Sequence, residues 1–509
     1  MNHLSKIQPV SVLGRQSIVV GMLGVILLAT FLRLLGLEAQ SIAFDEGYSL
    51  AVGSADWPTL FQATLSSGVH PPLFYILYKL VLPLWGTTEY GARFIAAAFG
   101  ILAVPLTYKL GSLLFDRRVA WLAAALLALN PVHVWLSQEA RMYALLITLT
   151  LAGMLCFWQA LHTRGRRYWL GLIVLQALVF NLHFFGLWLP LIQFGFILAN
   201  FGRYHRQFRV WTAAQFSAGL TLLPWLVALS TREFQSFGIG FLDKPTLIDL
   251  PLTLWNLSMG LILNQIWPLS LVAFAIALLA LSSGLYRTKH SFGRSQLLLS
   301  IWLFAPLLLV WIISQRRSFY ADRYLSFLLP TLILLVAFGV LRLKQPAWQY
   351  LLLAGLIANS LYGLIAIKFE PIFQKDPWRD LASFIEQRER PGDVILLYST
   401  HLRFPFDYYY RGHSPEKPIS LNLERYPLES LVADHRRAWV IYPYTRRPTH
   451  YPMQPLLADG YWADDPDRNP LLVNWLDTYS SHVVDYRHFL GIQLWLVDLP
   501  ERQEVTNRG

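Results

Sequence analysis

Two adjacent carboxylates, Asp45 and Glu46, follow an apolar segment, 17–37, that is long enough to span a bilayer. The stretch from Glu38 to Val69 that holds them also carries Asp56 and contains no Lys or Arg. One such carboxylate can deprotonate an attacking hydroxyl while its neighbour steadies a metal or a second hydroxyl. A solvated loop pair or a helix N-cap is the commoner fate of an acidic dipeptide. The position of the pair nevertheless favours a catalytic role.

The acidic stretch runs directly into His70, which precedes Pro71 and Pro72. A histidine here can bind a metal, or it can contact a phosphate or a sugar. The alternative is a turn residue held by the two prolines. Only one or two further ligands stand nearby, so the sequence leaves the cofactor, including a divalent metal, unassigned.

A second polar group lies between two expected membrane helices, from Ser137 to Tyr143, and includes Glu139 and Arg141. Polar side chains that enter a membrane helix are costly unless they face a cavity. We expect Arg141 to reach a phosphate, because its planar, permanently charged group suits that geometry. The alternative is a pair between Glu139 and Arg141 at the helix start. His183 is at a similar depth, and we expect a hydrogen-bonded core histidine there.

A third group, Arg316, Arg317, Arg323 and Tyr324, joins two late apolar segments on the same expected side. Arg and Tyr often anchor a protein at the membrane interface. Several arginines and tyrosines together equally favour binding of a lipid phosphate.

The composition indicates a membrane protein and excludes an ordinary soluble one. Of 509 residues, 55% are hydrophobic and 14% are charged, whereas soluble domains have about 25% charged residues. The net charge of +11 comes largely from short basic clusters between apolar runs, which is a topology signal and not a nucleic-acid surface. The single cysteine, Cys156, excludes an intrachain disulfide and a Cys-based zinc site.

Hydropathy predicts about eleven membrane helices and a retained N-terminal signal anchor. They are expected near 17–37, 93–115, 119–136, 139–161, 168–184, 186–201, 210–229, 265–286, 297–314, 324–341 and 347–367. With a cytoplasmic N-terminus, the basic connections fall on the cytoplasmic side. This count requires the short apolar run 71–85 to lie along the outer surface as a juxtamembrane helix.

After Ile367 the character of the sequence changes. Residues 368–509 hold no spanning run and predict a small α/β domain. A helix is expected at 377–385, and strands at 394–398, 438–442 and 491–499. The fold class is therefore a multi-pass helical membrane domain, 1–367, with a catalytic outer loop, 38–92, and an extracytoplasmic α/β domain.

At these residues the sequence resembles the GT-C glycosyltransferases, specifically the group related to protein O-mannosyltransferases and the aminoarabinose transferases of lipid A. The order and topological side of four motifs carry the resemblance across the membrane part. The motifs are Asp45-Glu46, His70-Pro71-Pro72-Leu73, Ser137-Gln138-Glu139-Ala140-Arg141-Met142-Tyr143 and Asp322-Arg323-Tyr324. The C-terminal domain resembles the extracytoplasmic domain of many bacterial members.

The resemblance implies an inverting transferase of the cell envelope that uses a polyprenyl-phosphate-linked sugar and an acceptor protein, lipid or glycan. Asp45 would be the catalytic base and Glu46 its support. His70 would lie near the donor, and Arg141 and Arg323 would hold its phosphate. The implied location is the bacterial plasma membrane.

A transporter or flippase of a polyprenyl-linked or sugar substrate is the competing interpretation. Such a protein usually has its critical charges near the bilayer midplane and often shows inverted repeats. In this sequence the informative charges cluster at the expected outer face, and no repeat is apparent.

Overall fold

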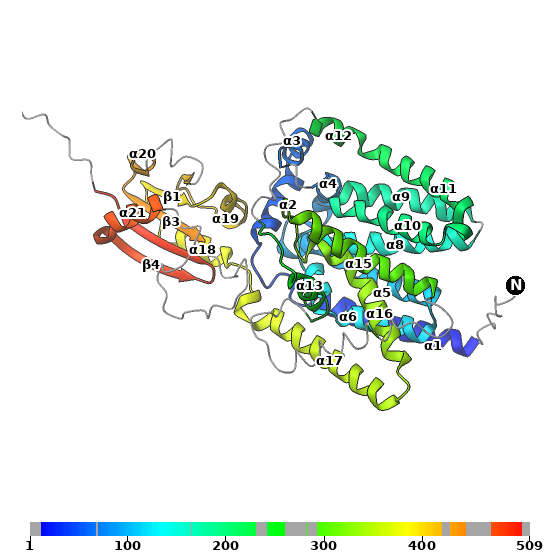
Figure 1. Cartoon of the computed structure of the whole chain (residues 1–509). Coiled ribbons are helices and arrows are strands. Elements are labelled where there is room, and N and C mark those ends of the chain that lie inside the picture. Colours follow the sequence, from blue (N-terminus) through cyan, green and yellow to red (C-terminus); the bar gives the residue numbers. More distant parts are fainter. Residues whose placement is uncertain are drawn as a thin grey trace, which may run out of the picture. The chain divides into compact units, whose positions relative to one another are not determined.

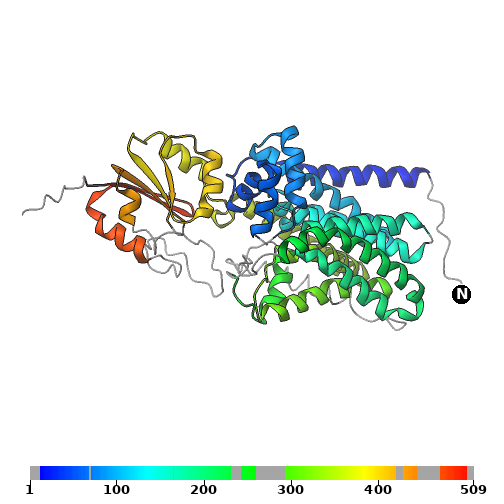
Figure 2. The same cartoon turned by 90° about the horizontal axis from the view of Figure 1, so that it is seen from above.

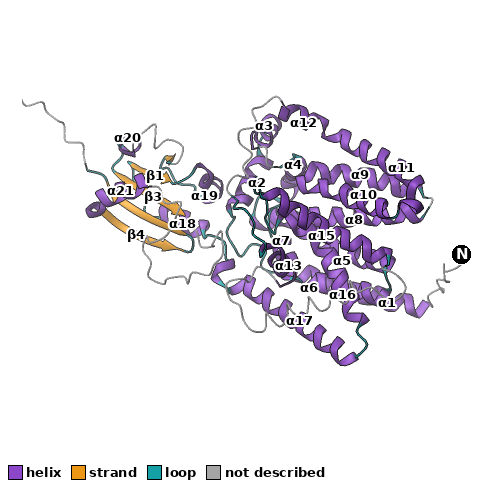
Figure 3. Cartoon of the chain, viewed as in Figure 1, coloured by secondary structure: helices purple, strands orange, loops and turns teal. Residues whose placement is uncertain are grey.

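A computed structural model describes residues 12–67, 70–163, 165–230, 242–259, 282, 293–419, 428–443 and 470–500. The chain divides into two compact units. The first unit contains residues 1–37 and 53–367, and the second contains 38–52 and 368–509. In the described residues the first unit is helical, and every strand belongs to the second unit (Figure 3).

The first unit is a bundle of α-helices joined by short 3-10 turns (Figures 1 and 2). Its α-helices are α1 (Val12–Leu34), α3 (Trp57–Ser67), α4 (Leu73–Trp85), α5 (Glu89–Leu114), α6 (Arg117–Leu129), α7 (Pro131–Ser137), α8 (Tyr143–His162), α9 (Arg166–Leu182), α10 (Trp188–Ala199), α11 (Phe201–Gly219), α12 (Leu223–Ser230), α13 (Asp249–Met259), α15 (Arg294–Ser314), α16 (Leu329–Arg342) and α17 (Pro346–Phe369). The 3-10 turns are η1 (Phe184–Leu187), η2 (Leu220–Leu222) and η4 (Tyr324–Leu328). At the centre, α5 packs against α6 and α8, α8 packs against α9, and α16 packs against α6.

Six described helices are long and apolar enough to cross a membrane, and a bent pair of helices brings the number to seven. Two expected spans are represented by shorter apolar helices, at Val19–Leu34 and Phe184–Ala199, and the span expected at 168–184 corresponds to α9, a helix of 17 residues. The span expected at 265–286 lies outside the described residues except for residue 282. The count of about eleven therefore stays a prediction, whereas the multi-pass helical architecture is confirmed.

The expected span 119–136 is not one straight helix. It is the bent pair, in which α6 and α7 meet at 58°. Asn130 produces the break: its backbone ends α6, and its side-chain oxygen accepts the His133 N–H at 2.9 Å to begin α7. Pro131 then occupies the first turn of α7, where it lacks only a donor that would have no partner within the helix.

The expected juxtamembrane helix 71–85 is present as α4, which begins after Pro72 and ends before Gly86. Its thirteen residues are too few to cross a bilayer as a straight helix. Its position on the outer surface stays a prediction.

The second unit contains a five-stranded sheet in the order β2-β1-β3-β5-β4. The strands are β1 (Asp393–Leu397), β2 (Glu416–Pro418), β3 (Arg437–Pro443), β4 (Val483–Phe489) and β5 (Ile492–Asp498). Strand β1 pairs in parallel with β2 and β3, and β5 pairs antiparallel with β3 and β4. The α/β class is confirmed, and the three expected strands correspond to β1, β3 and β5.

Helices cover both faces of this sheet. One face packs against α18 (Trp378–Glu386) and α19 (Arg403–Tyr409), and the other packs against α20 (Leu428–Val432) and α21 (Pro470–Thr478). The remaining turns of the unit are η5 (Pro371–Phe373), η6 (Thr400–Leu402) and η7 (Ser480–His482). Side chains of β1 and β3 alternate between the two cores, which explains why both strands are almost continuously apolar.

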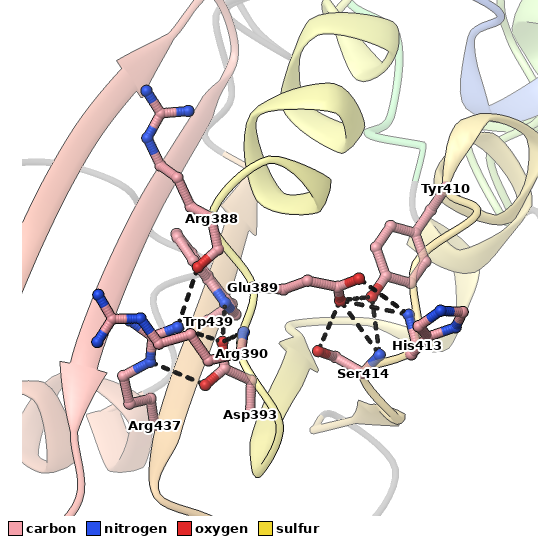
Figure 4. A network of polar contacts seen from close by, with 9 residues as sticks. All are labelled: Arg388, Glu389, Arg390, Asp393, Tyr410, His413, Ser414, Arg437 and Trp439. Atoms are coloured by element: carbon pink, nitrogen blue, oxygen red, sulfur yellow. Dashed lines mark hydrogen bonds and ion pairs between the residues drawn. The ribbon is translucent and has the colours of Figure 1, made fainter.

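A buried carboxylate fixes the start of the sheet. Asp393 accepts two hydrogen bonds from Arg437, at 2.8 and 2.7 Å, and a third from the Trp439 indole N–H at 2.9 Å (Figure 4). Nearby, Glu389 accepts the His413 backbone N–H and the Ser414 hydroxyl. Asp393 thus joins the start of β1 to the start of β3, and Glu389 holds the loop before the edge strand β2.

Candidate active site

The connection between α7 and α8 places Arg141. Gln138 ends α7, and its side-chain amide donates to the Leu32, Arg33 and Leu35 carbonyls at 3.1–3.2 Å. Leu32 and Arg33 are in the last turn of α1, where carbonyls have no partner within the helix, and Leu35 directly follows it. Gln138 thus fixes the end of α1 to the connection that carries Arg141, which is only 5% exposed.

His70 contacts Arg141 directly. The distance from Arg141 Nη2 to His70 Nε2 is 3.1 Å. A guanidinium group can only donate, so Nε2 must accept and the ring hydrogen lies on Nδ1. Burial holds the pKa of His70 well below its ordinary value, and its neighbours His183, Arg141 and Arg323 lower this pKa further. His70 is therefore neutral at pH 7.

His183 belongs to the same group of side chains. It is buried and hydrogen-bonded, as the sequence indicated, but its ring also lies 4.9 Å from the His70 ring, centroid to centroid. The sequence did not assign it to the site. The sequence signal for assigning His183 to the site is its place as a polar residue between two apolar runs, on the same expected side as the other motifs.

Two tyrosines and a second arginine complete the group. The Arg323 guanidinium lies 6.0 Å from the Tyr143 ring centre and 5.5 Å from the Tyr324 ring centre. Both tyrosine rings lie beside His183, at 6.0 and 5.5 Å. We call His70, Arg141, Tyr143, His183, Arg323 and Tyr324 the donor-side cluster.

Helix α13 holds the loop that carries Arg323. The Thr253 hydroxyl donates to one oxygen of Asp322 at 2.5 Å, and the Asn256 amide donates to the other. Thr253 also contacts the Tyr320 hydroxyl at 2.7 Å. Burial raises the pKa of Asp322, and the two hydrogen bonds partly offset this effect. The sequence motif contains Asp322, but nothing local in the sequence indicates its partners on α13.

The remaining residues predicted to bind substrate lie outside this cluster. Arg316 and Arg317 are exposed after the end of α15, and Glu139 is half-buried, with its carbonyl accepting the Arg141 N–H at 2.7 Å. Their part in binding stays a prediction.

Asp45 and Glu46 lie in the first turn of α2 (Phe44–Ser54), in the second unit. Asp45 is half-buried, whereas Glu46 is only 1% exposed. One oxygen of Glu46 accepts the Ala43 N–H at 2.9 Å and lies 2.8 Å from the Lys375 ammonium. The sequence left open a solvated pair or a helix cap. Glu46 is buried, which excludes a solvated role for it, and its contact with the Ala43 N–H caps α2.

The acidic loop, residues 38–52, packs closely on α19. A Cβ at Gly47 would lie 2.8 Å from the Phe404 backbone, so any larger residue would force the two segments apart. The Phe44 and Tyr48 rings flank the Phe404 ring at 6.2 and 5.2 Å. The Tyr409 hydroxyl accepts the Ile42 N–H at 2.7 Å. Within the second unit, α2 is thereby held at several points.

The part of the chain that the structure describes offers no suitable set of ligands for a divalent metal. Across the described ranges, no group of three or more His, Cys, Asp or Glu side chains could hold a metal ion. His70, for which the sequence left a metal-binding role open, gives its Nε2 lone pair to Arg141, a positive group that disfavours a nearby cation. The residues around His70 do not fit a metal.

Residues 69–229 match the family model described as dolichyl-phosphate-mannose-protein mannosyltransferase. A comparison with curated protein sequences found no match.

The fold is similar to that of ArnT from Cupriavidus metallidurans. The apo crystal structure is 13% identical, with a TM-score of 0.61, over 95% of this chain and 98% of that chain. The structure of ArnT bound to undecaprenyl phosphate is also 13% identical, with a TM-score of 0.61, over 94% and 98% of the two chains.

The Archaeoglobus fulgidus oligosaccharyltransferase, in complex with Zn and sulfate, is a more distant likeness. It is 14% identical, with a TM-score of 0.53, over 82% of this chain and 67% of that chain. At these identities the likenesses establish the fold, and the family match of residues 69–229 adds the class of enzyme. The chain is thus a membrane glycosyltransferase of the GT-C fold, as its motifs predict.

Proposed function

We propose that this enzyme moves a sugar, with inversion, from a polyprenyl-phosphate donor to an acceptor at the outer face of the plasma membrane. The observation that carries the proposal is the donor-side cluster, in which two arginines, two histidines and two tyrosines converge in the helical unit. A largely buried group of this composition suits a phosphate more than it suits a neutral or cationic ligand.

In this proposal Arg141 and Arg323 bind the phosphate of the donor. A polyprenyl phosphate is a poor leaving group unless its developing negative charge is stabilised, and fixed guanidinium groups supply that stabilisation. The neutral ring of His70 adds an N–H donor at Nδ1, and its Nε2 orients Arg141. The structure of ArnT with undecaprenyl phosphate supports this assignment, because a protein of the same fold binds such a lipid.

Asp45 is the proposed base. The acceptor hydroxyl attacks the anomeric carbon from the face opposite the phosphate, and its proton passes to the Asp45 carboxylate. The bond from the anomeric carbon to the phosphate oxygen breaks, and the lipid phosphate leaves with the electron pair. Asp45 suits this role because it is half-buried at the start of a helix, where an ionised carboxylate is favoured. Glu46 supports it by holding the first turn of α2.

The proposed orientation follows from the charge pattern of the sequence. Basic connections on the cytoplasmic side put the N-terminus in the cytoplasm and the second unit outside. The acceptor, a protein, lipid or glycan, would then reach Asp45 from the extracytoplasmic space.

The test uses purified protein in nanodiscs and a panel of radiolabelled polyprenyl-phosphate sugars. We expect sugar transfer or release by the wild type, and loss of turnover with retained donor binding in Asp45→Asn. Asp56→Asn is the matched control, because exposed Asp56 only caps α3, at 2.8 Å from the Thr59 nitrogen, and Asn caps helices equally well. Turnover unaffected by Asp45→Asn would exclude Asp45 as the base. Donor binding without turnover in the wild type, with acceptors present, would favour a transporter.

A further inference from the structure

The hydrogen bond between His183 and η1 fixes the tautomer of this histidine. His183 is the residue that follows α9, and its Nδ1 caps η1 by accepting the Phe185 backbone N–H at 3.1 Å. A nitrogen that accepts a hydrogen bond carries no hydrogen, so the hydrogen of the ring lies on Nε2. Nε2 is consequently a donor.

This donor is buried and has no hydrogen-bond partner among the described residues. His183 as a whole is only 2% exposed. A buried N–H without an acceptor is unfavourable, and such groups in native proteins are uncommon enough to require a specific reason.

The location of His183 supplies the reason. Its ring lies beside His70, Tyr143 and Tyr324, with centroid distances of 4.9, 6.0 and 5.5 Å. His70 presents a second buried N–H, at Nδ1, that also lacks a described partner. Two donors from distant parts of the chain therefore converge in the donor-side cluster.

We propose that the Nε2–H of His183 donates a hydrogen bond to an oxygen of the lipid-linked phosphate, beside the Nδ1–H of His70. The proposal rests on the proposed function and adds a binding residue to it. Two neutral N–H donors next to two arginines match a ligand that offers several acceptor oxygens on one atom, as a phosphate does. A sugar hydroxyl also has two lone pairs, but it is neutral and gains less from the two neighbouring arginines than a charged phosphate does.

Two substitutions separate this role from a purely structural one. Asn at position 183 has an oxygen where His has Nδ1, so it can still accept the Phe185 N–H, but it lacks the Nε2 donor. Gln has an amide at about the position of Nε2, so it keeps a donor but loses the bond to Phe185. If His183 binds the ligand, His183→Asn should lower the affinity more than His183→Gln does. If its role is only structural, His183→Gln should be the more damaging substitution.

The experiment measures binding of fluorescently labelled undecaprenyl phosphate to the full chain in nanodiscs, together with the unfolding temperature. We expect His183→Asn to weaken binding by about 10- to 100-fold, the loss typical of a hydrogen bond to a charged group, with an unfolding temperature close to that of the wild type. His183→Gln should keep the affinity within about threefold and unfold at a lower temperature. His205→Asn, at an exposed histidine, is the matched control and should bind like the wild type.

The outcomes distinguish the two proposals. A wild type that does not bind undecaprenyl phosphate contradicts the proposed function itself. Wild-type affinity in His183→Asn, or an equal loss for undecaprenol, which has no phosphate, overturns the role of His183 alone. An effect on the sugar-linked donor but not on undecaprenyl phosphate would move the contact to the sugar and overturn the phosphate assignment.

Discussion

At the scale of single residues, Arg141 and His70 form a directional pair. The guanidinium donates to the imidazole, which leaves the Nδ1–H of His70 for a ligand and prevents His70 Nε2 from binding a cation. The pair therefore agrees with the proposed binding of an anion and explains the poor fit to a metal.

Arg141→Met should weaken donor binding by about 10- to 100-fold, because a buried charged hydrogen-bond donor to the phosphate is lost. Arg141→Lys should recover only part of the affinity, since an ammonium lacks the planar fork. The dissociation constant for labelled undecaprenyl phosphate is the measurement. Arg118→Met, at an exposed arginine, serves as the control, and equal affinities in the Met variants at 118 and 141 would contradict the assignment.

The lowered pKa of His70 makes a prediction about stability and pH. The folded state resists protonation of this ring, while the unfolded state accepts a proton at the ordinary pKa near 6.5. Stability should accordingly fall as the pH drops below about 6.5, by at most about 1.4 kcal/mol per pH unit for this one group. Thermal unfolding at pH 7.5 and 5.5 measures the loss, which should be smaller in His70→Gln. An identical pH dependence in that variant would contradict the shift.

The types of these residues could be predicted from the sequence, but their partners could not. Arg141, His70 and Arg323 stand out because charged groups at the ends of apolar runs require a reason. His183 has the same character, but a single histidine is more often a satisfied core residue. Its second nitrogen, which lacks a described partner, can be recognised only in three dimensions.

At the scale of elements, α13 connects two parts of the site. It holds Asp322 through Thr253 and Asn256, and its Leu257 carbonyl accepts the Asn130 side-chain amide at 3.0 Å. Asn130 in turn sets the break between α6 and α7, which leads to Arg141. A short helix thus contacts the supports of both proposed phosphate-binding arginines.

Thr253→Val should loosen the Arg323 loop, because it removes one of the two hydrogen bonds that α13 gives to half-buried Asp322. We expect a loss of stability of about 1.5–3 kcal/mol and weaker donor binding. Thr253→Ser, which keeps the hydroxyl, should restore both properties. Thr212→Val, at an exposed helical threonine whose hydroxyl contacts the Phe208 carbonyl, is the matched control for thermal unfolding and donor affinity. If Thr253→Val has the same stability and donor affinity as this control, α13 does not support Arg323.

Hydropathy predicted most elements of the helical unit well, because apolar length is a local property. It failed at the break in α6 and α7, since the 119–136 stretch remains apolar on both sides of Asn130-Pro131. In the second unit the buried strands β1 and β3 were visible as apolar runs. The edge strands β2 and β4 were missed because they are short or only partly buried, and so lack that pattern.

At the scale of the whole molecule, the acidic loop is built into the second unit. The sequence placed 38–52 with the membrane part because it follows the first apolar run. The compact units instead place it with 368–509, through Lys375, Phe404 and Tyr409. Contacts between residues separated by most of the chain leave no local signal, so this arrangement required the structure.

Lys375 is the strongest of these links. It neutralises Glu46, whose side chain is 2% exposed and whose oxygen caps α2 one residue after Asp45. Without the ammonium, the buried carboxylate would lack its partner charge, and the first turn of α2 would rearrange to expose or protonate it. Asp45 would move with that turn.

Lys375→Met should therefore lower kcat by up to about 100-fold, since a displacement of about 1 Å of a catalytic group has an effect of that size, while donor affinity stays near that of the wild type. Lys375→Arg should recover most of the turnover, because it restores the ion pair. In a Glu46→Gln background Lys375→Met should add little, since the buried charge is already gone. Lys368→Met, at an exposed lysine of the same unit, is the control, and equal kcat values for the Met variants at 368 and 375 would show that the ion pair does not position Asp45.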